Sequence, residues 1–492
     1  MAEEHREAPE LRALPTPTAL IAVVAGVIIA AIVFTKGIRD PDYFWHLTAG
    51  KLISTSGVVP STDPFSFTWA GQPWTPHEWL GEVILYLLAQ LGGATASLIA
   101  FAAVAAAVPA VLAWTLRRLG VRPAAVGLVL ATTVLVLAPY VTVRPQAISW
   151  LLMALLLAGL VQLSPARPWV ALGLGPFFAL WANLHGLWVV GLGVVGVYLL
   201  FSVLGRTPMA ARWIWVAAGM AVAVLGTGLT PAGPEGILYP LRYVEAGDWG
   251  LENIQEWQSP NFHDASHAGL LVLILALIAT GGRAAPGWMI ALSWIGVAMA
   301  LVALRNAPVA AVLAAPALGL ALEGLLARRA ANRRRRELRP SVQLGRRVIE
   351  IAAAATISVV GIVIVLGQPG RATDDSSYPV AGTDRLILVA PDARVIGEYG
   401  WGGYLISRLH ERGGRVFVDG RNDMYPQSIL EKYSAFRDAD AGWEGIANRS
   451  GADALLFPPS ATISKVAAGS GEWCEAYRDE AQVLFLRDCA AA

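Results

Sequence analysis

Residues 39–83 read RDPDYFWHLTAGKLISTSGVVPSTDPFSFTWAGQPWTPHEWLGEV and follow directly on an apolar run that extends from Ala19 to Phe34. The segment combines several carboxylates with two histidines and four tryptophans, which is more polar chemistry than a simple connection between helices requires. Connecting segments on a rigid scaffold often carry binding and catalytic residues. We therefore interpret residues 39–83 as part of a functional site that is supported by the apolar runs around it.

The composition is that of a membrane protein. The 492 residues are 55% hydrophobic and only 15% charged, and their mean hydropathy is +0.54. A soluble domain carries about 25% charged residues. The formal net charge of +1 gives no general attraction to nucleic acid, so we expect no nucleic-acid partner.

Apolar runs recur along the whole chain. About 20 apolar residues cross the ~30 Å hydrocarbon layer of a bilayer. The first run follows MAEEHREAPELR, whose four glutamates and missing small-residue cleavage site favour an uncleaved helix over a signal peptide. We predict a polytopic α-helical membrane protein of about eleven transmembrane helices. The expected spans are residues 17–36, 96–116, 122–141, 146–163, 168–185, 187–205, 212–230, 267–282, 285–303, 307–327 and 348–367.

The basic residues predict the orientation of these spans, because short cytoplasmic loops carry an excess of Lys and Arg. LGEVILYLLAQL, residues 80–91, is short for a span, and we expect it to lie along the interface. The N-terminus and the basic loops are then cytoplasmic, and we expect the protein in the plasma membrane. Lys36 and Arg39, at the outer end of the first helix, depart from this rule. The basic loops are residues 117–122, 164–168, 205–212, 281–285 and 328–347.

The last of these loops, residues 328–347, holds nine arginines and one glutamate. We expect this cluster to orient the chain and to contact anionic lipid head groups. We divide the chain into a transmembrane domain, residues 1–367, and an extracytoplasmic α/β domain, residues 368–492. The opening extracytoplasmic loop of the first domain is residues 37–95.

The C-terminal domain contains strand-like stretches at residues 415–420, 452–458 and 482–488, while residues 394–409 look partly helical around a glycine-rich turn. In VDGRNDMY, we expect a salt-bridged turn that contains Asp419, Arg421 and Asp423, with a binding face as the alternative.

Cys474 and Cys489 are the only cysteines of the chain, and both lie in the C-terminal domain. Extracytoplasmic compartments are oxidising, and two cysteines on that side favour a disulfide. We predict that Cys474 and Cys489 are bonded and that they close the final hairpin.

The unusual polar stretches all fall on the predicted extracytoplasmic side, as do six of the seven histidines, His5 being the exception. Ionisable groups at membrane depth are costly and usually mark a site. We therefore predict one polar cavity that faces outward under the opening loop. The stretches are DPDYFWH (40–46), TDPFSFT (62–68), PHEW (76–79), VRPQ (143–146), WANLHG (181–186), IQEWQSPNFHD (254–264) and LRN (304–306).

Several of the polar residues have purely structural alternatives. Asp42 precedes a helical stretch and is also a candidate N-cap, whereas Asp40 and Asp63 precede prolines and suit turns. His185 lies where a helix reaches the outer face, and there a bond to a backbone carbonyl is the alternative to a functional role. Trp45, Trp69, Trp74 and Trp79 suit an interfacial aromatic belt as well as a substrate platform.

The charged candidates suggest two kinds of ligand. Arg144 and Arg305 are each the only basic residue at the outer end of an apolar run. Each either reaches a lipid phosphate or binds a ligand phosphate through both guanidinium nitrogens. His46, His77 and Glu78 lack the HExxH or cysteine spacing of a metal site, so we expect no metal.

This order of motifs resembles the GT-C superfamily of integral membrane glycosyltransferases, in particular its ArnT-like and protein O-mannosyltransferase-like branches. The combination DPDYFWHL…PSTDPFSFT…PWTPHEWL…VRPQ…WANLHG…EWQSP…WGGYL…VDGR also resembles a group of uncharacterised bacterial membrane proteins placed near that superfamily. The likeness covers nearly the whole chain, in architecture more than in motif. The acid that follows the first helix in that superfamily is matched by Asp40 or Asp42, and the spacing does not choose between them.

The resemblance implies an enzyme that moves a sugar from a polyprenyl-phosphate donor to an extracytoplasmic glycan, lipid or protein acceptor and inverts the anomeric centre, without a cofactor. Asp42 or Asp40 would be the base, with Glu78 in reserve. Arg144 and Arg305 would stabilise the leaving phosphate. The residues that would bind the rest of the substrate are His46, His77, His185 and Glu256.

Two other functions stay open at this point. A transporter or flippase of a lipid-linked or anionic substrate would need polar residues across the whole membrane, and the sequence shows no inverted repeat. A non-catalytic scaffold that binds a lipid of the cell envelope would use the same outward cavity.

Overall fold

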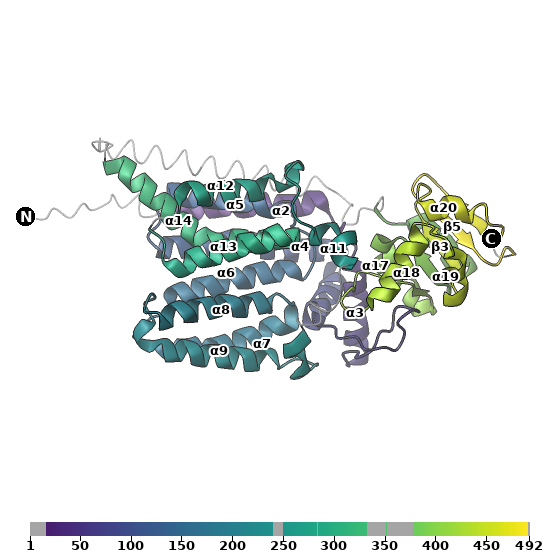
Figure 1. The fold of residues 1–492 in the computed structure, drawn as a ribbon, viewed down its shortest axis with the longest axis horizontal. Coiled ribbons are helices and arrows are strands. Elements are labelled where there is room, and N and C mark those ends of the chain that lie inside the picture. The colour runs from purple at the N-terminus through teal and green to yellow at the C-terminus, as the bar shows by residue number, and fades with distance from the viewer. Residues whose placement is uncertain (1–15, 240–248, 283, 332–350, 352–376, 491–492) are drawn as a thin grey trace, which may run out of the picture.

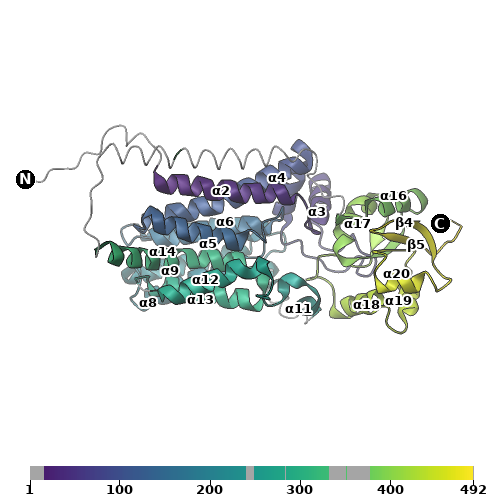
Figure 2. The ribbon, with the colours of Figure 1, turned by 90° about the horizontal axis from the view of Figure 1, so that it is seen from above.

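We describe the protein in a computed structural model, which covers residues 16–239, 249–282, 284–331, 351 and 377–490. A bundle of helices runs along the long axis of the molecule, and the C-terminal region packs against one end of it (Figure 1). Viewed from above, α2 (Pro17–Lys36) lies along one edge of this bundle (Figure 2). The predicted span at residues 348–367 and most of the arginine-rich loop lie outside the described residues.

The bundle helices are apolar on every side, as expected for helices in lipid or in a membrane-protein core. Each predicted span from 17–36 to 307–327 overlaps one of these helices. Among the described residues, four helices are long and apolar enough to cross a membrane, at Pro17–Lys36, Trp79–Arg118, Ala210–Thr227 and Leu304–Arg328. Helix α9 (Trp213–Thr227) forms most of the third long helix, and α14 (Ala307–Ala331) forms most of the fourth. The shorter helices are α5 (Pro123–Leu137), α6 (Gln146–Gln162), α7 (Leu174–Leu184), α8 (Trp188–Val203), α12 (Ala268–Thr280) and α13 (Gly287–Val302).

Helix α4 (Trp79–Arg118) consists of two segments that meet at Gly92 and Gly93, whose backbone is not helical. Gly93 has φ 62°, a conformation that glycine adopts without the steric cost that a Cβ brings. The break separates residues 79–91 from the rest of the helix. This boundary agrees with the division between the predicted interfacial segment and the predicted span at 96–116.

The C-terminal region contains a five-stranded sheet of order β2-β1-β3-β5-β4. Its strands are β1 (Arg394–Gly397), β2 (Arg415–Val416), β3 (Ala454–Phe457), β4 (Cys474–Arg478) and β5 (Val483–Leu486). β1 pairs in parallel with β2 and β3, and the last three strands are antiparallel. β2, β3 and β5 lie within the predicted stretches, and α17 (Gly402–Leu409) provides the expected helix. β1 was not predicted, because four residues before a glycine-rich turn show no clear alternation.

Further short helices in this region are α16 (Val380–Val389), α18 (Gln427–Arg437), α19 (Trp443–Ser450), α20 (Thr462–Ala467) and the single turns at Tyr399–Trp401 and His410–Arg412. The predicted disulfide is confirmed, because Cys474 and Cys489 are bonded. The bond joins β4 to the end of the chain after β5, so it closes the antiparallel hairpin at the sheet edge.

We expect replacement of both Cys474 and Cys489 by serine to lower the free energy of unfolding of this region by about 3 kcal/mol, because the bond closes a loop of about 15 residues in the unfolded chain. Chemical unfolding of the purified protein with and without the substitutions measures the difference. A reductant should destabilise the wild type to the same extent and leave the double variant unchanged. Two titratable thiols in unreduced, denatured wild-type protein would contradict the assignment.

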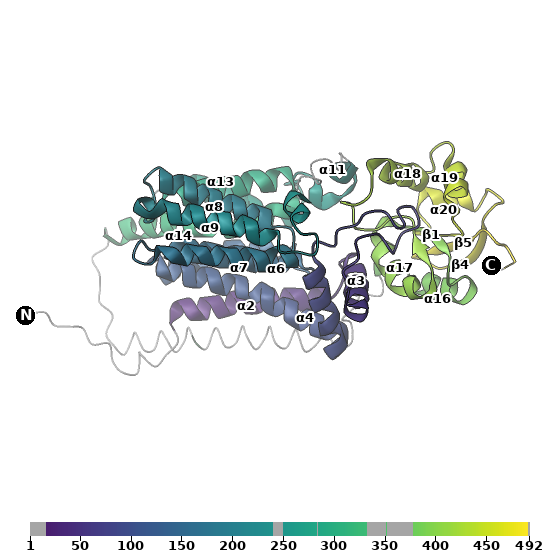
Figure 3. The ribbon, with the colours of Figure 1, turned by 90° about the horizontal axis from the view of Figure 1, so that it is seen from below.

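The opening loop is attached to the C-terminal sheet. Helix α3 (Tyr43–Ser56) lies between the bundle and the C-terminal region, and the loop that follows it extends along that region (Figure 3). Ser66 forms a parallel bridge with Val416 of β2. The Phe67 amide donates to the Val416 carbonyl at 3.0 Å, and the Val416 amide donates to the Phe65 carbonyl at 3.2 Å. Residues 65–67 thus extend the sheet beyond β2.

A buried ion pair fixes this attachment. The Arg421 guanidinium lies 2.8 Å from an Asp63 carboxylate oxygen and 2.7 Å from Asp419, and all three side chains are buried. The rings of Phe65 and Trp74 lie 4.8 and 4.6 Å from the same guanidinium. The predicted salt-bridged turn is therefore confirmed for Asp419 and Arg421, and its arginine also reaches the opening loop. Asp423 contacts Tyr239 instead. Asp63 forms the predicted turn as well, since it accepts hydrogen bonds from the Phe65 and Ser66 amides.

Candidate active site

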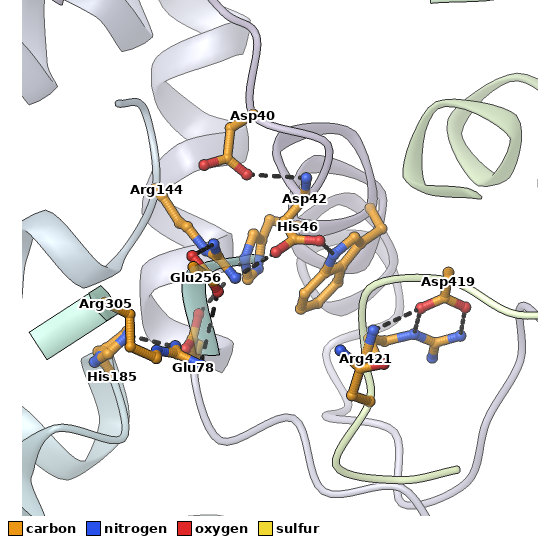
Figure 4. Close-up of polar contacts among 12 residues, drawn as sticks. Asp40, Asp42, His46, Glu78, Arg144, His185, Glu256, Arg305, Asp419 and Arg421 are labelled. Carbon is orange, nitrogen blue, oxygen red and sulfur yellow. Dashed lines mark hydrogen bonds and ion pairs between the residues drawn. The ribbon is translucent and has the colours of Figure 1, made fainter. Parts of the chain in front are cut away.

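Asp40 and Asp42 lie in the short connection between α2 and α3. Figure 4 shows their side chains beside that of Arg144. The Asp42 amide donates to Asp40 Oδ1 at 3.0 Å, so Asp40 forms a turn over Pro41. Asp42 makes no capping hydrogen bond, and the N-cap alternative for this residue is wrong. Its carboxylate instead accepts a hydrogen bond from Trp45 Nε1 at 2.9 Å and forms an ion pair with Arg144.

A chain of alternating charges continues from Asp42. Arg144 lies 3.4 Å from Glu256, and the other Glu256 oxygen lies 3.7 Å from Arg305. The Trp257 ring lies 4.6 Å from the Arg305 guanidinium, a distance at which the ring face attracts the cation. Asp42, Arg144, Glu256 and Arg305 come from four separate polar stretches of the sequence, and the structure brings them together (Figure 4).

Burial affects the acids of this chain differently. Burial raises the pKa of Asp40 to about 6, and the nearby Arg144 offsets only part of this effect. Burial also opposes ionisation of Glu256, but Arg144 and Arg305 outweigh it and hold the Glu256 pKa below its usual range. Asp40 is therefore partly protonated at mildly acidic pH, whereas Glu256 stays ionised between the two guanidinium groups.

A cavity of about 360 Å³ opens beside this chain, and we refer to it as the cationic cavity. Lys36 and Arg39, the residues that depart from the basic-loop rule, line it together with Arg144 and Arg305. Lys36 Nζ donates to the Ala138 and Pro139 carbonyls at 2.7 Å. The charged residues that line the cavity are Lys36, Arg39, Asp40, Arg144, Glu256 and Arg305.

Three imidazoles surround the carboxylate of Glu78. His77 Nε2 and His185 Nε2 each lie 3.3 Å from Glu78 Oε1, and His46 Nε2 lies 3.5 Å from Glu78 Oε2. The other nitrogen of His46 lies 3.4 Å from Glu82. Within the part of the chain that the structure describes, no group of three or more His, Cys, Asp or Glu side chains is arranged to hold a metal ion.

The hydrogen bonds of His185 define its protonation. The Leu187 amide donates to His185 Nδ1 at 3.1 Å, and Ser149 Oγ lies 3.0 Å from the same nitrogen. Nδ1 therefore accepts hydrogen bonds, and Nε2 carries the proton and points to Glu78. The alternative that His185 bonds to a backbone carbonyl is wrong.

Glu78 is ionised in this arrangement. Burial alone would raise its pKa, but His185, His77 and His46 outweigh burial and hold the Glu78 pKa well below its usual range. Both carboxylate oxygens lie next to imidazole nitrogens. Glu78 is thus better placed to hold the three histidines than to take a proton from a substrate.

The C-terminal region closes the site at Asp42. Gly420, in the turn between Asp419 and Arg421, lies so close to Asp42 that a Cβ on it would collide with Oδ1. Three residues after Gly420, the Asp423 carboxylate contacts the Tyr239 hydroxyl, and the Tyr239 ring lies 4.8 Å from the ring of His77.

Comparison with family models and with curated proteins gives no match. Solved structures do match. An oligosaccharyltransferase from Archaeoglobus fulgidus, tethered to an acceptor peptide with the NVT sequon, aligns with TM-score 0.54 and 11% identity over 88% of this chain and 68% of its own. ArnT from Cupriavidus metallidurans aligns with TM-score 0.52 in the apo state and 0.50 when bound to undecaprenyl phosphate, each with 14% identity over 96% of this chain and 98% of its own.

The arabinofuranosyltransferase AftD from Mycobacteria aligns with TM-score 0.54 and 14% identity, over 96% of this chain and 40% of its own. These matched proteins are GT-C glycosyltransferases. This chain has the GT-C fold. The resemblance drawn from the sequence motifs is thereby confirmed for the fold, while the roles of individual residues stay predictions.

Within this GT-C fold, three of the loop tryptophans hold polar groups in place. Trp45 is 7% exposed and binds Asp42, and Trp74 packs on Arg421. Trp79 Nε1 donates to Asn183 Oδ1 at 2.6 Å. Because Trp45, Trp74 and Trp79 make these internal contacts, the alternative that they form an interfacial aromatic belt does not hold for them.

Sequence reasoning missed Asn183, Trp257 and Gly420. Asn183 and His185 are the two polar side chains of WANLHG, and one holds Trp79 while the other holds Glu78. An amide in an otherwise apolar helix end was the available signal for Asn183. Trp257 adjoins Glu256 but carries no charge, and Gly420 acts through the absence of a side chain, so neither gave a comparable signal.

Proposed function

We propose that this protein transfers a sugar from a polyprenyl-phosphate donor to an extracytoplasmic acceptor, with inversion at the anomeric carbon. The observation that carries the proposal is the cationic cavity next to Asp42, where four basic side chains meet. Phosphate is bound well by converging guanidinium and ammonium groups. The GT-C fold supports this function, as does the ArnT structure that holds undecaprenyl phosphate.

In the proposed reaction, Asp42 takes the proton of the acceptor hydroxyl. The acceptor oxygen forms a bond to the anomeric carbon from the side opposite the phosphate, which accounts for inversion. The bond between that carbon and the phosphate oxygen breaks, and the phosphate leaves with the electron pair. Arg144 and Arg305 stabilise the charge that develops on it. Glu256 holds both guanidinium groups in place before the donor arrives.

The distribution of buried charge favours a transferase over a transporter. Among the described Asp, Glu, His, Lys and Arg residues, those that are buried belong to the opening loop and the start of α4, to His185 after α7, to His267 before α12, or to the C-terminal region. A transport path would need such groups across the bundle. The cavity thus suits a reaction at one face of the membrane.

The experiment is conversion of the donor by purified protein in lipid nanodiscs. Polyprenyl-phosphate mannose, glucose and arabinose are supplied in turn with an extract of envelope glycans, lipids and proteins as acceptor, and ³¹P NMR follows the change from phosphodiester to phosphomonoester. We expect conversion of one donor that depends on acceptor. Donor binding without conversion of any of them would identify a scaffold, and movement of intact donor between leaflets would identify a flippase.

A further inference from the structure

Both carboxylate oxygens of Asp42 are occupied. Oδ1 accepts the indole N–H of Trp45 at 2.9 Å and lies against Gly420, and Oδ2 forms the ion pair with Arg144. Asp42 is 5% exposed, and it is not one of the described residues that line the cationic cavity. An acceptor hydroxyl can therefore reach this carboxylate only after one of its three neighbours has moved.

The neighbours of Oδ1 belong to one packed unit that does not yield easily. Trp45 is buried and packs in the same apolar cluster as the strands of the C-terminal sheet. Gly420 lies between Asp419 and Arg421, which form a buried ion pair, and the Tyr425 hydroxyl donates to the same Asp419 at 2.7 Å. Moving this turn away from the bundle would disturb the buried pair, and breaking such a pair is strongly destabilising.

The neighbour of Oδ2 can move more easily. The Arg144 side chain is 20% exposed and lines the cationic cavity, whose volume is about 360 Å³. One of its terminal nitrogens contacts Asp42, and the other lies 3.4 Å from Glu256 (Figure 4). Arginine side chains have several rotatable bonds, so the guanidinium can turn into the cavity while the backbone stays in place.

A phosphate in the cationic cavity would compete with Asp42 for Arg144. Guanidinium groups bind phosphate best through two parallel N–H···O bonds, and Asp42 holds one of the nitrogens that such a pair of bonds uses. Lys36, Arg39 and Arg305 line the same cavity, so they would stabilise the phosphate further. The distribution of charge thus favours the phosphate over Asp42 as the partner of Arg144.

We propose that the donor phosphate displaces Asp42 from Arg144, so that the base is released only when a donor is bound. The role of Asp42 as the base rests on the proposed function. Trp45 continues to hold Oδ1, and Oδ2, which loses its partner, takes the proton of the acceptor hydroxyl. The donor therefore binds before the acceptor hydroxyl contacts Asp42. Loss of the product phosphate and of the proton to solvent restores the ion pair.

Binding of farnesyl phosphate to Asp42→Asn tests the proposal. This probe carries the isoprenoid and the phosphate of the proposed donor but no sugar, so it binds without conversion. If Arg144 is released from Asp42 in about a tenth of the molecules, its apparent affinity for phosphate is lowered about tenfold. Asp42→Asn removes the competing charge, keeps an oxygen for the Trp45 N–H and leaves Arg144 paired with Glu256. We therefore expect it to bind farnesyl phosphate about tenfold more tightly than the wild type, by isothermal titration calorimetry in lipid nanodiscs.

Asp40→Asn is the matched control for the loss of a negative charge. Asp40 lines the cavity itself, and its carboxylate bonds to the Asp42 amide. Because burial raises the pKa of Asp40 to about 6, the titrations are done at mildly alkaline pH, where this carboxyl is ionised. Asp40→Asn then changes only the electrostatic field at the phosphate, and we expect it to tighten binding no more than about twofold.

Two double variants test whether the gain passes through Arg144. Asp42→Asn should change the affinity for farnesyl phosphate less than about twofold in an Arg144→Gln background, because two groups that act through one contact are not additive. In an Arg305→Gln background, which keeps the Asp42–Arg144 pair, the gain of about tenfold should persist. If Arg144→Gln does not fold, the comparison of Asp42→Asn with Asp40→Asn decides by itself.

Three results would overturn the proposal. Unchanged or weaker binding to Asp42→Asn would mean that the ion pair holds Arg144 in place for the phosphate. Equal gains from Asp40→Asn and Asp42→Asn would assign the effect to the field alone. Absence of farnesyl phosphate binding to the wild type and to Asp42→Asn would mean that the cavity takes no lipid phosphate.

The two proposals fail separately. If no donor is converted but Asp42→Asn binds farnesyl phosphate more tightly through Arg144, the transferase is wrong and the exchange at Arg144 stands. If a donor is converted while Asp42→Asn binds farnesyl phosphate no more tightly than the wild type, the transferase stands and the exchange is wrong.

Discussion

Asp42→Asn should reduce donor conversion by about 10²–10⁴, because a general base contributes about that factor to a rate. The amide oxygen can still accept the Trp45 N–H, so the local fold should be preserved. Single-turnover conversion followed by ³¹P NMR measures the loss. Asp264→Asn is the matched control, since Asp264 is exposed and caps the turn before α12. It should convert the donor within twofold of the wild type.

The same variant decides between Asp42 and Asp40. If Asp40 were the base, Asp42→Asn would retain nearly full activity. The ionised form of Asp40 would then carry the reaction, and because burial raises its pKa to about 6, the rate would fall as the pH drops through 6. Full activity of Asp42→Asn together with such a profile would transfer the catalytic role to Asp40.

Arg421→Met should destabilise the protein by about 3–5 kcal/mol, because it leaves Asp63 and Asp419 buried without their cation. The loss should detach the opening loop from the C-terminal sheet. Chemical unfolding measures the free energy, and limited proteolysis should cut residues 57–76 faster in the variant than in the wild type.

Two further variants test whether the loss of stability comes from the buried charges or follows from the removal of any arginine. Arg408→Met removes the more exposed pair with Asp384, which should cost less than about 1 kcal/mol. Asp63→Asn and Asp419→Asn, added to Arg421→Met, remove the uncompensated charges and should recover much of the stability. A loss as large for Arg408→Met as for Arg421→Met would contradict the role given to the buried pair.

The sequence predicted the helices well because apolar runs are a local property. The Asp419–Arg421 turn was predictable because its residues are neighbours in the sequence. The disulfide was predictable because Cys474 and Cys489 have no other possible partner in the chain. The strand β1 was missed because its pairing with β2 and β3 is not visible in four residues.

The candidate site was predictable only as a collection of residues. One-sided clustering of polar stretches indicated that Asp42, Arg144, Glu256 and Arg305 belong together, and the structure places them in one chain of contacts. Periodicity could not show which residue each of them contacts. Trp45 donates a hydrogen bond to Asp42, and Trp79 donates one to Asn183, which is 104 residues away in the sequence. Such pairings depend on how the helices pack.

The attachment of residues 65–67 to β2 also limits how the chain can thread the bilayer. Two segments that share hydrogen bonds occupy the same aqueous compartment, so residues 68 and 415 lie on one side of the membrane. The chain between them must therefore cross an even number of times, whatever the length of each helix. Since α2 precedes residue 37 and is long enough to cross once, we expect residues 16 and 490 to lie on opposite sides, an expectation that does not depend on counting arginines.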